Sequence, residues 1–164
     1  MNAPQDHKAY KYVGTRPVRP DGEDKVTGKA MGAAVHSNVG LFHATMAIFN
    51  AWCDRMPIVI LGATGPVDAM KRRPWIDWIH TAADQGAIIR NYTKWDDQPA
   101  SAGAAREAVL RANWIANTIP QGPTYVNLDA EVQEGKLPAP LPPGQGPTFL
   151  VLGQMKSGTS TLFK

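Results

Sequence analysis

The residues best suited to chemistry stand in one segment, His36-Ser37-Asn38-Val39-Gly40, which opens an apolar stretch of the chain. A polar turn at the start of a helix offers free backbone N–H groups and side-chain donors, and its glycine lets another group approach closely. The segment therefore indicates a binding loop. The structural alternative is that Ser37 or Asn38 caps the helix. His36 and His43 could hydrogen-bond a cofactor or serve a structural role.

A second candidate lies near the end of the chain, at Lys156 to Thr161. A strand, a Lys-Ser-Gly-Thr turn and the start of a helix form a cradle for an anion. Lys156 precedes Gly158, which is not the order of a Walker A loop, where the lysine follows the second glycine. The alternative is a frayed tail, because the sequence ends before a full helix can form.

Acidic residues suggest weaker sites. Asp77, His80 and Asp84 share no spacing that would place them on one face, so we expect no metal site there. Asp129 and Glu131 follow a predicted strand, and they fit either an acidic strand exit or a solvated loop.

The single cysteine, Cys53, excludes an intrachain disulfide, and its apolar helical surroundings predict a packed small side chain. Four tryptophans could line a cleft or lie buried in a core or an interface. They are Trp75, Trp78, Trp95 and Trp114.

Short aliphatic runs alternate with longer amphipathic stretches, which predicts an α/β domain with a mainly parallel sheet. Ligands of such sheets bind at the carboxyl ends of the strands. We expect strands at 32–36, 57–61, 92–95, 123–128 and 148–153, helices at 40–53 and 102–117, the latter capped by Ser101, short helical pieces at 75–80 and 81–89, and a loop at 62–66.

Composition divides the chain into four parts: an extended polar arm at 1–30, the α/β region at 31–134, a Pro/Gly-rich linker at 135–147 and a truncated strand-loop segment at 148–164. The net charge of the 164 residues is only +3. The triplet Lys71-Arg72-Arg73 stands alone and is typical of a solvated loop, so we expect no nucleic-acid partner. No run is apolar enough for a signal peptide or a membrane span, so we expect a cytoplasmic protein with no membrane partner.

Several stretches, taken together, resemble a known family. They are Val26-Thr27-Gly28-Lys29, the segment from His36 to Gly40, Asp54-Arg55-Met56-Pro57-Ile58-Val59 leading into Gly62, Tyr92-Thr93-Lys94-Trp95, and Gly122 to Asp129. The region resembles the later part of the N-terminal, pyrimidine-binding domain of thiamine-diphosphate-dependent enzymes of the acetolactate synthase and decarboxylase type.

The resemblance implies an incomplete three-layer domain of the thiamine-diphosphate-binding fold, acting on a 2-keto acid. The family's Ser-Gly-Pro-Gly loop matches here at Ser37 and Gly40, whereas Asn38 and Val39 replace its central pair and His43 stands where synthases carry asparagine. The implied cofactor-binding residues are therefore Ser37, Asn38, Gly40 and His43.

The family's catalytic glutamate and its Gly-Asp-Gly motif for Mg²⁺ and diphosphate have no counterpart in the sequence. No catalytic residue is therefore assigned. We expect no activity from this chain alone, and a partner that is either a second copy or a complete subunit of the same family. We also expect an exposed strand near Val35 or Val59, because the first βα units of the domain are missing, and hence self-association.

The two ends resemble other families. Residues 12–30 resemble the start of the molybdenum-cofactor subunit of aldehyde oxidases and xanthine dehydrogenases, and residues 149–163 resemble the phosphosulfate-binding loop of sulfotransferases. Two alternative functions follow: a noncatalytic fusion remnant or interaction module, and a sulfonucleotide-binding protein.

Overall fold

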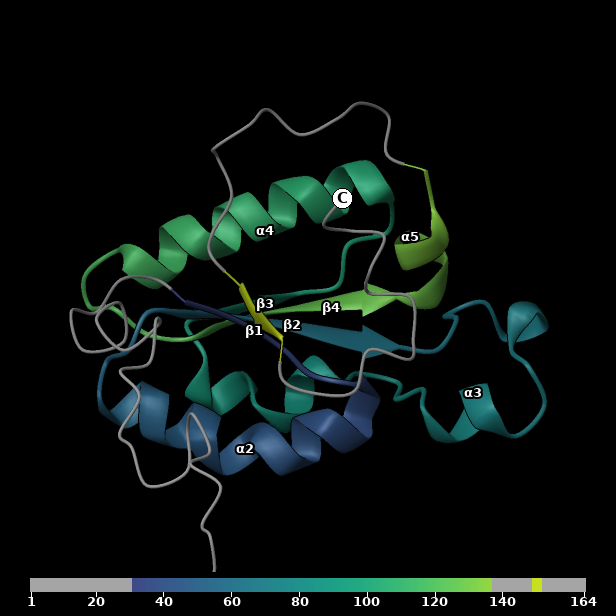
Figure 1. Cartoon of the computed structure of the whole chain (residues 1–164), viewed down its shortest axis with the longest axis horizontal. Helices are drawn as coiled ribbons and strands as arrows, with labels where there is room; N and C mark the ends of the chain where they lie inside the picture. The colour runs from purple at the N-terminus through teal and green to yellow at the C-terminus, as the bar shows by residue number, and fades with distance from the viewer. Residues whose placement is uncertain (1–30, 137–148, 152–164) are drawn as a thin grey trace, which may run out of the picture.

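The computed structural model describes residues 31–136 and 149–151, which form three layers with a sheet between helices (Figure 1). The sheet has five strands in the order β3-β4-β2-β1-β5, and every pairing is parallel. The strands are β1 (Met31–Ala34), β2 (Ile58–Thr64), β3 (Trp95–Asp97), β4 (Thr124–Asp129) and β5 (Phe149–Val151). The predicted α/β class with a parallel sheet is confirmed. The predicted arm, most of the linker and Lys156 to Thr161 lie outside the described residues.

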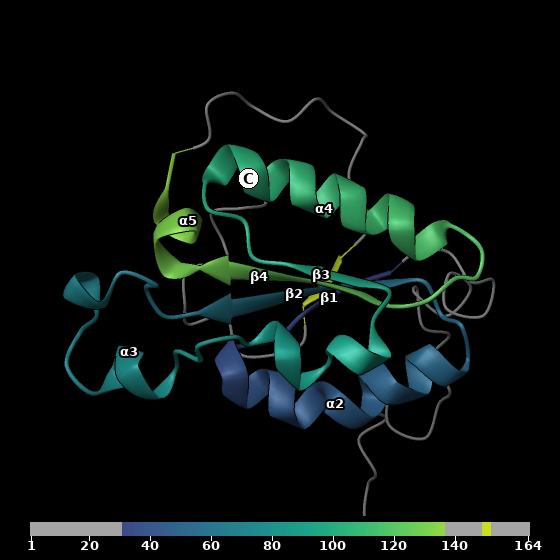
Figure 2. The ribbon, with the colours of Figure 1, turned by 180° about the vertical axis from the view of Figure 1, so that it is seen from behind.

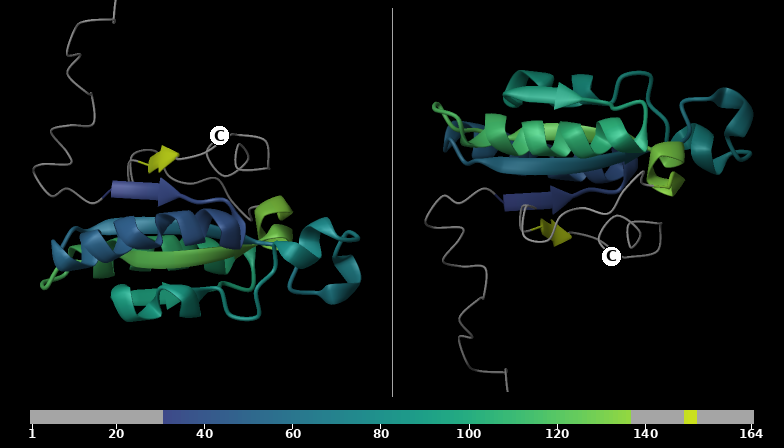
Figure 3. Two further views of the ribbon diagram at one scale, coloured as in Figure 1. Left: turned by 90° about the horizontal axis from the view of Figure 1, so that it is seen from below. Right: turned by 90° about the horizontal axis from the view of Figure 1, so that it is seen from above.

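Helices cover both faces of the sheet (Figure 2). On one face lie α2 (Ser37–Cys53) and the short 3₁₀ turns η2 (Gly86–Ile88) and η3 (Arg90–Tyr92); on the other lie α4 (Ala102–Asn117) and α5 (Ala130–Glu134). An excursion containing η1 (Ala69–Lys71) and α3 (Ile76–Ile79) projects past the carboxyl ends of the strands (Figures 1 and 3). None of the helices among the described residues is long and apolar enough to cross a membrane.

Each face of the sheet has its own core. Below α4, the small side chains of Ala105, Ala108, Ala112 and Ala116 form a buried stripe that lets the helix pack closely on Val59, Leu61, Val126 and Leu128. Between α2 and the sheet, the bulkier Leu41 and Ile48 pack on Ile60, Ile89 and Tyr125. Alternate residues of β2 and β4 thus feed opposite cores, as the pleat of a strand requires.

The predicted helix at 102–117 is confirmed with its cap, since the Ser101 hydroxyl accepts a hydrogen bond from the Ala104 N–H at 3.1 Å. The loop predicted at 62–66 begins later, because β2 continues to Thr64. Gly62 makes this possible: a Cβ there would lie 1.9 Å from the Tyr125 hydroxyl of the neighbouring strand. The strand predicted at 92–95 lies at 95–97 instead, after η3, and the predicted helix at 40–53 begins at Ser37.

Two further predictions are wrong. Strands β1 and β2 are interior, because β1 lies between β2 and β5 and β2 lies between β1 and β4, so no sheet edge is exposed near Val35 or Val59 (Figure 3). The edges of the described sheet are β3 and β5. Cys53 is exposed rather than packed, because it ends α2 on the side away from the sheet core.

Candidate functional site

The segment from His36 to Gly40 connects the carboxyl end of β1 to α2. The Val35 N–H donates to the Leu61 carbonyl at 2.9 Å and so extends the pairing of β1 with β2 by one residue. The chain then turns sharply, and Ser37 has a φ of 50°, a left-handed conformation that is uncommon outside glycine. Such strain persists only where the surroundings hold it, and it is concentrated at functional sites.

No side chain caps the N-terminus of α2. His36 is the N-cap residue, but it makes no side-chain cap hydrogen bond, and the first turn contains no acidic residue. The Gly40 N–H donates to the His36 carbonyl at 2.6 Å, whereas the N–H groups before it have no partner within the helix. The structural alternative of a cap by Ser37 or Asn38 is therefore wrong. The positive end of the helix dipole is thus not neutralised by a side-chain cap.

Buried polar atoms without partners occur at this N-terminus and at the carboxyl end of the adjacent strand β2. The Ser37 hydroxyl is unpartnered although the residue is only 3% exposed, and the Asn38 Oδ1 atom is likewise buried and unpartnered. The Thr64 hydroxyl, at the carboxyl end of the adjacent strand, is a third such atom. A buried polar group without a partner costs about 1–3 kcal/mol, so these atoms mark a place where a polar ligand would be stabilising.

Three of the four predicted cofactor-binding residues lie in the first turn of α2, and the fourth lies outside it. Ser37, Asn38 and Gly40 share the first turn of α2, and the Asn38 amide also donates to the Ile79 carbonyl at 3.0 Å. Gly40 serves packing, because a Cβ there would lie 3.2 Å from the backbone of Val35. His43 lies in the second turn with an exposed side chain.

His80, at the end of α3, lies beside His36. The rings of His36 and His80 lie 5.5 Å apart between centroids. The Nδ1 atom of His80 lies 2.7 Å from the Ile76 carbonyl, which can only accept, so Nδ1 carries the proton. In the neutral ring, Nε2 is then an acceptor.

The structure does not bring Asp77, His80 and Asp84 together as a metal site. Arg73 pairs with Asp77 through its guanidinium (2.8 Å) and its backbone N–H (2.7 Å), and these hydrogen bonds lower the pKa of Asp77. Asp84 pairs instead with Arg90 at 2.8 Å, which lowers the pKa of Asp84. Within residues 31–136 and 149–151, no three His, Cys, Asp or Glu side chains are grouped as metal ligands.

Asp129 is not part of a solvated loop. It is buried, its Oδ1 atom caps α5 by accepting from the Glu131 N–H at 2.7 Å, and its other oxygen accepts from the Val67 N–H. The basic triplet Lys71-Arg72-Arg73 is also held by specific contacts, two ion pairs and one ring contact. Lys71 pairs with Glu131, Arg73 pairs with Asp77, and Arg72 stacks over the Trp78 ring at 4.8 Å.

The tryptophans line no common cleft. Trp75, Trp78 and Trp114 are exposed, and only Trp95 packs against the core below α4.

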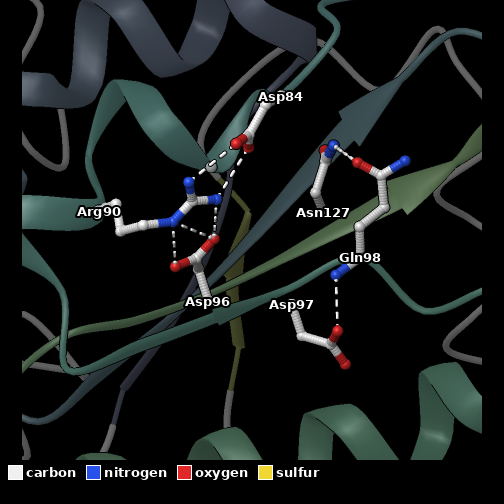
Figure 4. A pocket seen from close by; sticks show the side chains of 7 residues that line it. Asp84, Arg90, Asp96, Asp97, Gln98 and Asn127 are labelled. Carbon is white, nitrogen blue, oxygen red and sulfur yellow. Dashed lines mark hydrogen bonds and ion pairs between the residues drawn. The ribbon is translucent and has the colours of Figure 1, made fainter.

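A polar cavity of about 240 Å³, which the sequence did not reveal, lies at the carboxyl end of β3, beside Asn127 of β4 (Figure 4). Arg90 is held between two carboxylates there, at 2.8 Å from Asp84 and 2.7 Å from Asp96. Asp84 precedes η2, Arg90 begins η3 and Asp96 lies in β3, so the periodicity of a single helix or strand could not find them. The lining consists of Asp84, Gly86, Arg90, Asp96, Asp97, Gln98 and Asn127.

The wall of this cavity is a connected network. Asn127 donates to Gln98 at 2.9 Å and accepts from Tyr125 and Gln85, both at 3.2 Å. Burial raises the pKa of Tyr125 above its ordinary value, so its hydroxyl stays protonated and can donate. The network joins η2 to β4 and fixes the cavity wall.

Solved structures with a similar fold include thiamine-diphosphate-dependent enzymes. The chain matches a thiamine diphosphate-dependent 4-hydroxybenzoylformate decarboxylase of Rhodococcus jostii (TM-score 0.57, 22% identity, 66% of this chain and 20% of that chain). It also matches a benzoylformate decarboxylase of Polynucleobacter necessarius (TM-score 0.63, 22% identity, 74% and 22%). A third match is a Mycobacterium smegmatis protein described as a thiamin diphosphate-dependent enzyme (TM-score 0.62, 22% identity, 78% and 23%).

The chain therefore has the α/β fold of part of these enzymes, and it spans about a fifth of their length. No protein-family model matches the sequence.

Proposed function

We propose that this chain is a partial thiamine-diphosphate-binding domain, of the acetolactate synthase-like group, that takes part in a reaction of a 2-keto acid. The observation that carries the proposal is the uncapped N-terminus of α2 with the buried, unpartnered Ser37 hydroxyl beside it. The fold shared with thiamine-diphosphate decarboxylases supports the same assignment.

The unpartnered atoms fit the polar end of this cofactor. An aminopyrimidine ring carries ring nitrogens that accept hydrogen bonds and an amino group that donates them. The Ser37 hydroxyl can donate to a ring nitrogen, and the Asn38 Oδ1 atom can accept from an amino group. When bound, the cofactor supplies a carbon nucleophile for addition to the keto carbonyl.

The chain's own contribution is orientation. Because Ser37 is buried and conformationally restrained, its hydroxyl is held in place before a ligand arrives. His43 and Gly40 complete the proposed cofactor-binding set. Mg²⁺ and the diphosphate would be held by a complete subunit of the same family, and without it the chain would be inactive. A cytoplasmic location belongs to the same proposal.

Calorimetric titration with thiamine diphosphate and Mg²⁺, with and without a complete decarboxylase subunit, tests the proposal. We expect heat of binding in the mixture beyond that of the complete subunit alone, and an affinity about tenfold weaker for Ser37→Ala, the loss of one buried hydrogen bond. Ser101→Ala removes a hydroxyl from α4, on the other face of the sheet, and should leave the affinity unchanged. A mixture that gives no additional heat would refute the proposal.

A noncatalytic interaction module is the second candidate, and a specific observation favours it. The outward face of α2 exposes four large apolar side chains, Val39, Phe42, Met46 and Phe49.

A further inference from the structure

The Asn38 side-chain amide joins the N-terminus of α2 to the excursion that contains α3. Its Nδ2 atom donates to the carbonyl of Ile79, the last residue of α3, at 3.0 Å. A carbonyl oxygen only accepts hydrogen bonds, so the amide nitrogen must face Ile79 and the amide oxygen must take the opposite position. The orientation of an amide that could otherwise rotate by half a turn is therefore set by α3.

Helix α3 is itself held in place by its neighbours. With only four residues it is too short to be stable alone. The buried Asp77 carboxylate accepts from the Arg73 guanidinium at 2.8 Å and from the Arg73 backbone N–H at 2.7 Å. The Thr81 hydroxyl donates to the Asp77 carbonyl at 2.5 Å. The N–H of Gly65, which follows β2, donates to the His80 carbonyl at 3.3 Å. These contacts hold the end of α3 beside the N-terminus of α2.

The oxygen of the same amide is a fixed acceptor among donors. The Asn38 Oδ1 atom is buried and has no hydrogen-bond partner, and it belongs to the same helical turn as the unpartnered Ser37 hydroxyl. The first backbone N–H groups of a helix are donors without partners in the helix. A ligand that satisfies this turn must therefore carry a donor close to an acceptor. A carbonyl oxygen opposite Oδ1 would form no hydrogen bond, so it would be disfavoured.

The alternative is that the Asn38 amide only fastens the excursion. Other contacts already do so, because Lys71 pairs with Glu131 and Arg73 pairs with Asp77. A tether would also leave the buried Oδ1 atom as a cost with no return. The unpartnered oxygen favours a role in ligand selection.

We propose that α3 positions Asn38 as a specificity-determining residue. By binding Nδ2 through the Ile79 carbonyl, α3 commits Oδ1 to accept a hydrogen bond, and the site selects an amino group over a carbonyl group. Asp77 is then a positioning residue, which acts through α3 and contacts no ligand. The inference rests on the proposed function, because the amino group is that of the aminopyrimidine ring.

Two forms of the cofactor test the selection: thiamine diphosphate, and the analogue in which a carbonyl oxygen replaces the pyrimidine amino group. Calorimetry is done with Mg²⁺ on the mixture with a complete decarboxylase subunit, and the heat of that subunit alone is subtracted. The wild-type chain should prefer the amino form by at least about tenfold. Asn38→Ala should abolish this preference because it removes the acceptor. Asn38→Asp keeps an acceptor and should retain the preference.

Asp77→Ala tests the positioning role. It breaks the pair with Arg73, so α3 should loosen and the Asn38 amide should be free to turn its Nδ2 atom toward a carbonyl. We expect the preference for the amino form to fall by at least about threefold, with Asn38 itself intact. Glu107→Ala breaks an exposed ion pair on α4, on the other face of the sheet, and should leave the preference unchanged.

Trypsin reports on the seating of α3 without any ligand. Mass spectrometry can follow cleavage after Lys71 and Arg72, which lie in the excursion. Asn38→Ala, Asn38→Asp and Asp77→Ala should each be cleaved at least about threefold faster than the wild type, because each loses a contact that holds α3. Circular dichroism checks that the variants remain folded.

The outcomes separate this inference from the proposed function. A wild-type mixture that gives no additional heat would refute the proposed function and the inference with it. Binding with equal affinity for the two forms would overturn the role of Asn38 alone. An unchanged preference in Asp77→Ala, or unchanged cleavage in Asn38→Ala, would show that α3 does not position the amide.

Discussion

Helices α2 and α4 have nearly the same length and lie on opposite faces of one sheet, but they meet their surroundings in different ways. Helix α4 is closed at both ends by side chains: the Ser101 hydroxyl caps its N-terminus, and the Lys94 ammonium donates to the carbonyls of Ile115 and Thr118. Helix α2 has no side-chain cap at its N-terminus and leaves the Ser37 hydroxyl unpartnered.

The outward faces of the two helices also differ in the charge of their exposed side chains. Charged residues such as Glu107 and Arg111 stand on the exposed face of α4, whereas α2 exposes Phe42, Met46 and other apolar side chains. Helix α4 also exposes Leu110 and Trp114, but its N-terminus is capped and its Glu107 and Arg111 are paired. Helix α2 has no side-chain cap, and its N-terminus is where we propose that a cofactor binds.

Leu41→Ala should produce the largest loss of stability. The Leu41 side chain is fully buried and anchors α2 on the sheet, so its truncation should lower the free energy of unfolding by about 3 kcal/mol. The control Leu110→Ala, on the exposed face of α4, should change it by less than about 0.5 kcal/mol. Urea titration measures both. Equal losses would show that α2 is not anchored by its inward face.

The contrast between the helices explains what the sequence could predict. The extent of α4 followed from its alanine stripe and from Ser101, because a cap and a periodic face are local signals. The continuation of β2 past Gly62 did not, because the fit of a glycine there beside the Tyr125 ring involves a neighbouring strand. That contact joins residues 63 positions apart and leaves no local pattern.

The candidate site shows the same limit. The residue types from His36 to Gly40 indicated a binding loop, but only the register of β1 with β2 brings Thr64 to the same edge of the sheet. The role of Gly40, which packs on Val35, also required the three-dimensional structure.

Lys94→Met tests the closed end of α4 and should have an intermediate effect. Methionine keeps much of the length and the apolar stem of lysine but cannot donate to the carbonyls of Ile115 and Thr118. Partial burial lowers the pKa of Lys94 below its ordinary value. We expect a loss of about 1–2 kcal/mol in the free energy of unfolding. Arg111→Met breaks only an exposed ion pair and should cost less than about 0.5 kcal/mol; a similar cost for both would remove Lys94 as a cap.

Arg55→Gly tests the C-terminus of α2. It should have the smallest effect of the three on the free energy of unfolding, and the effect should be stabilising. Helix α2 is closed at its C-terminus by backbone alone: the Met56 N–H donates to the Ala51 carbonyl at 2.8 Å and the Arg55 N–H to the Trp52 carbonyl at 3.3 Å. This arrangement needs a left-handed residue after the C-cap, and Arg55 adopts it with a φ of 56°.

Glycine reaches that conformation without steric cost, whereas Arg55→Ala removes the same contact with the Trp52 ring and keeps the strain. Chemical denaturation should therefore show the glycine variant more stable than the alanine variant by about 1 kcal/mol. If the two variants were equally stable, the left-handed backbone would not limit α2. The stability of its C-terminal end would then depend on side-chain contacts, as it does in α4.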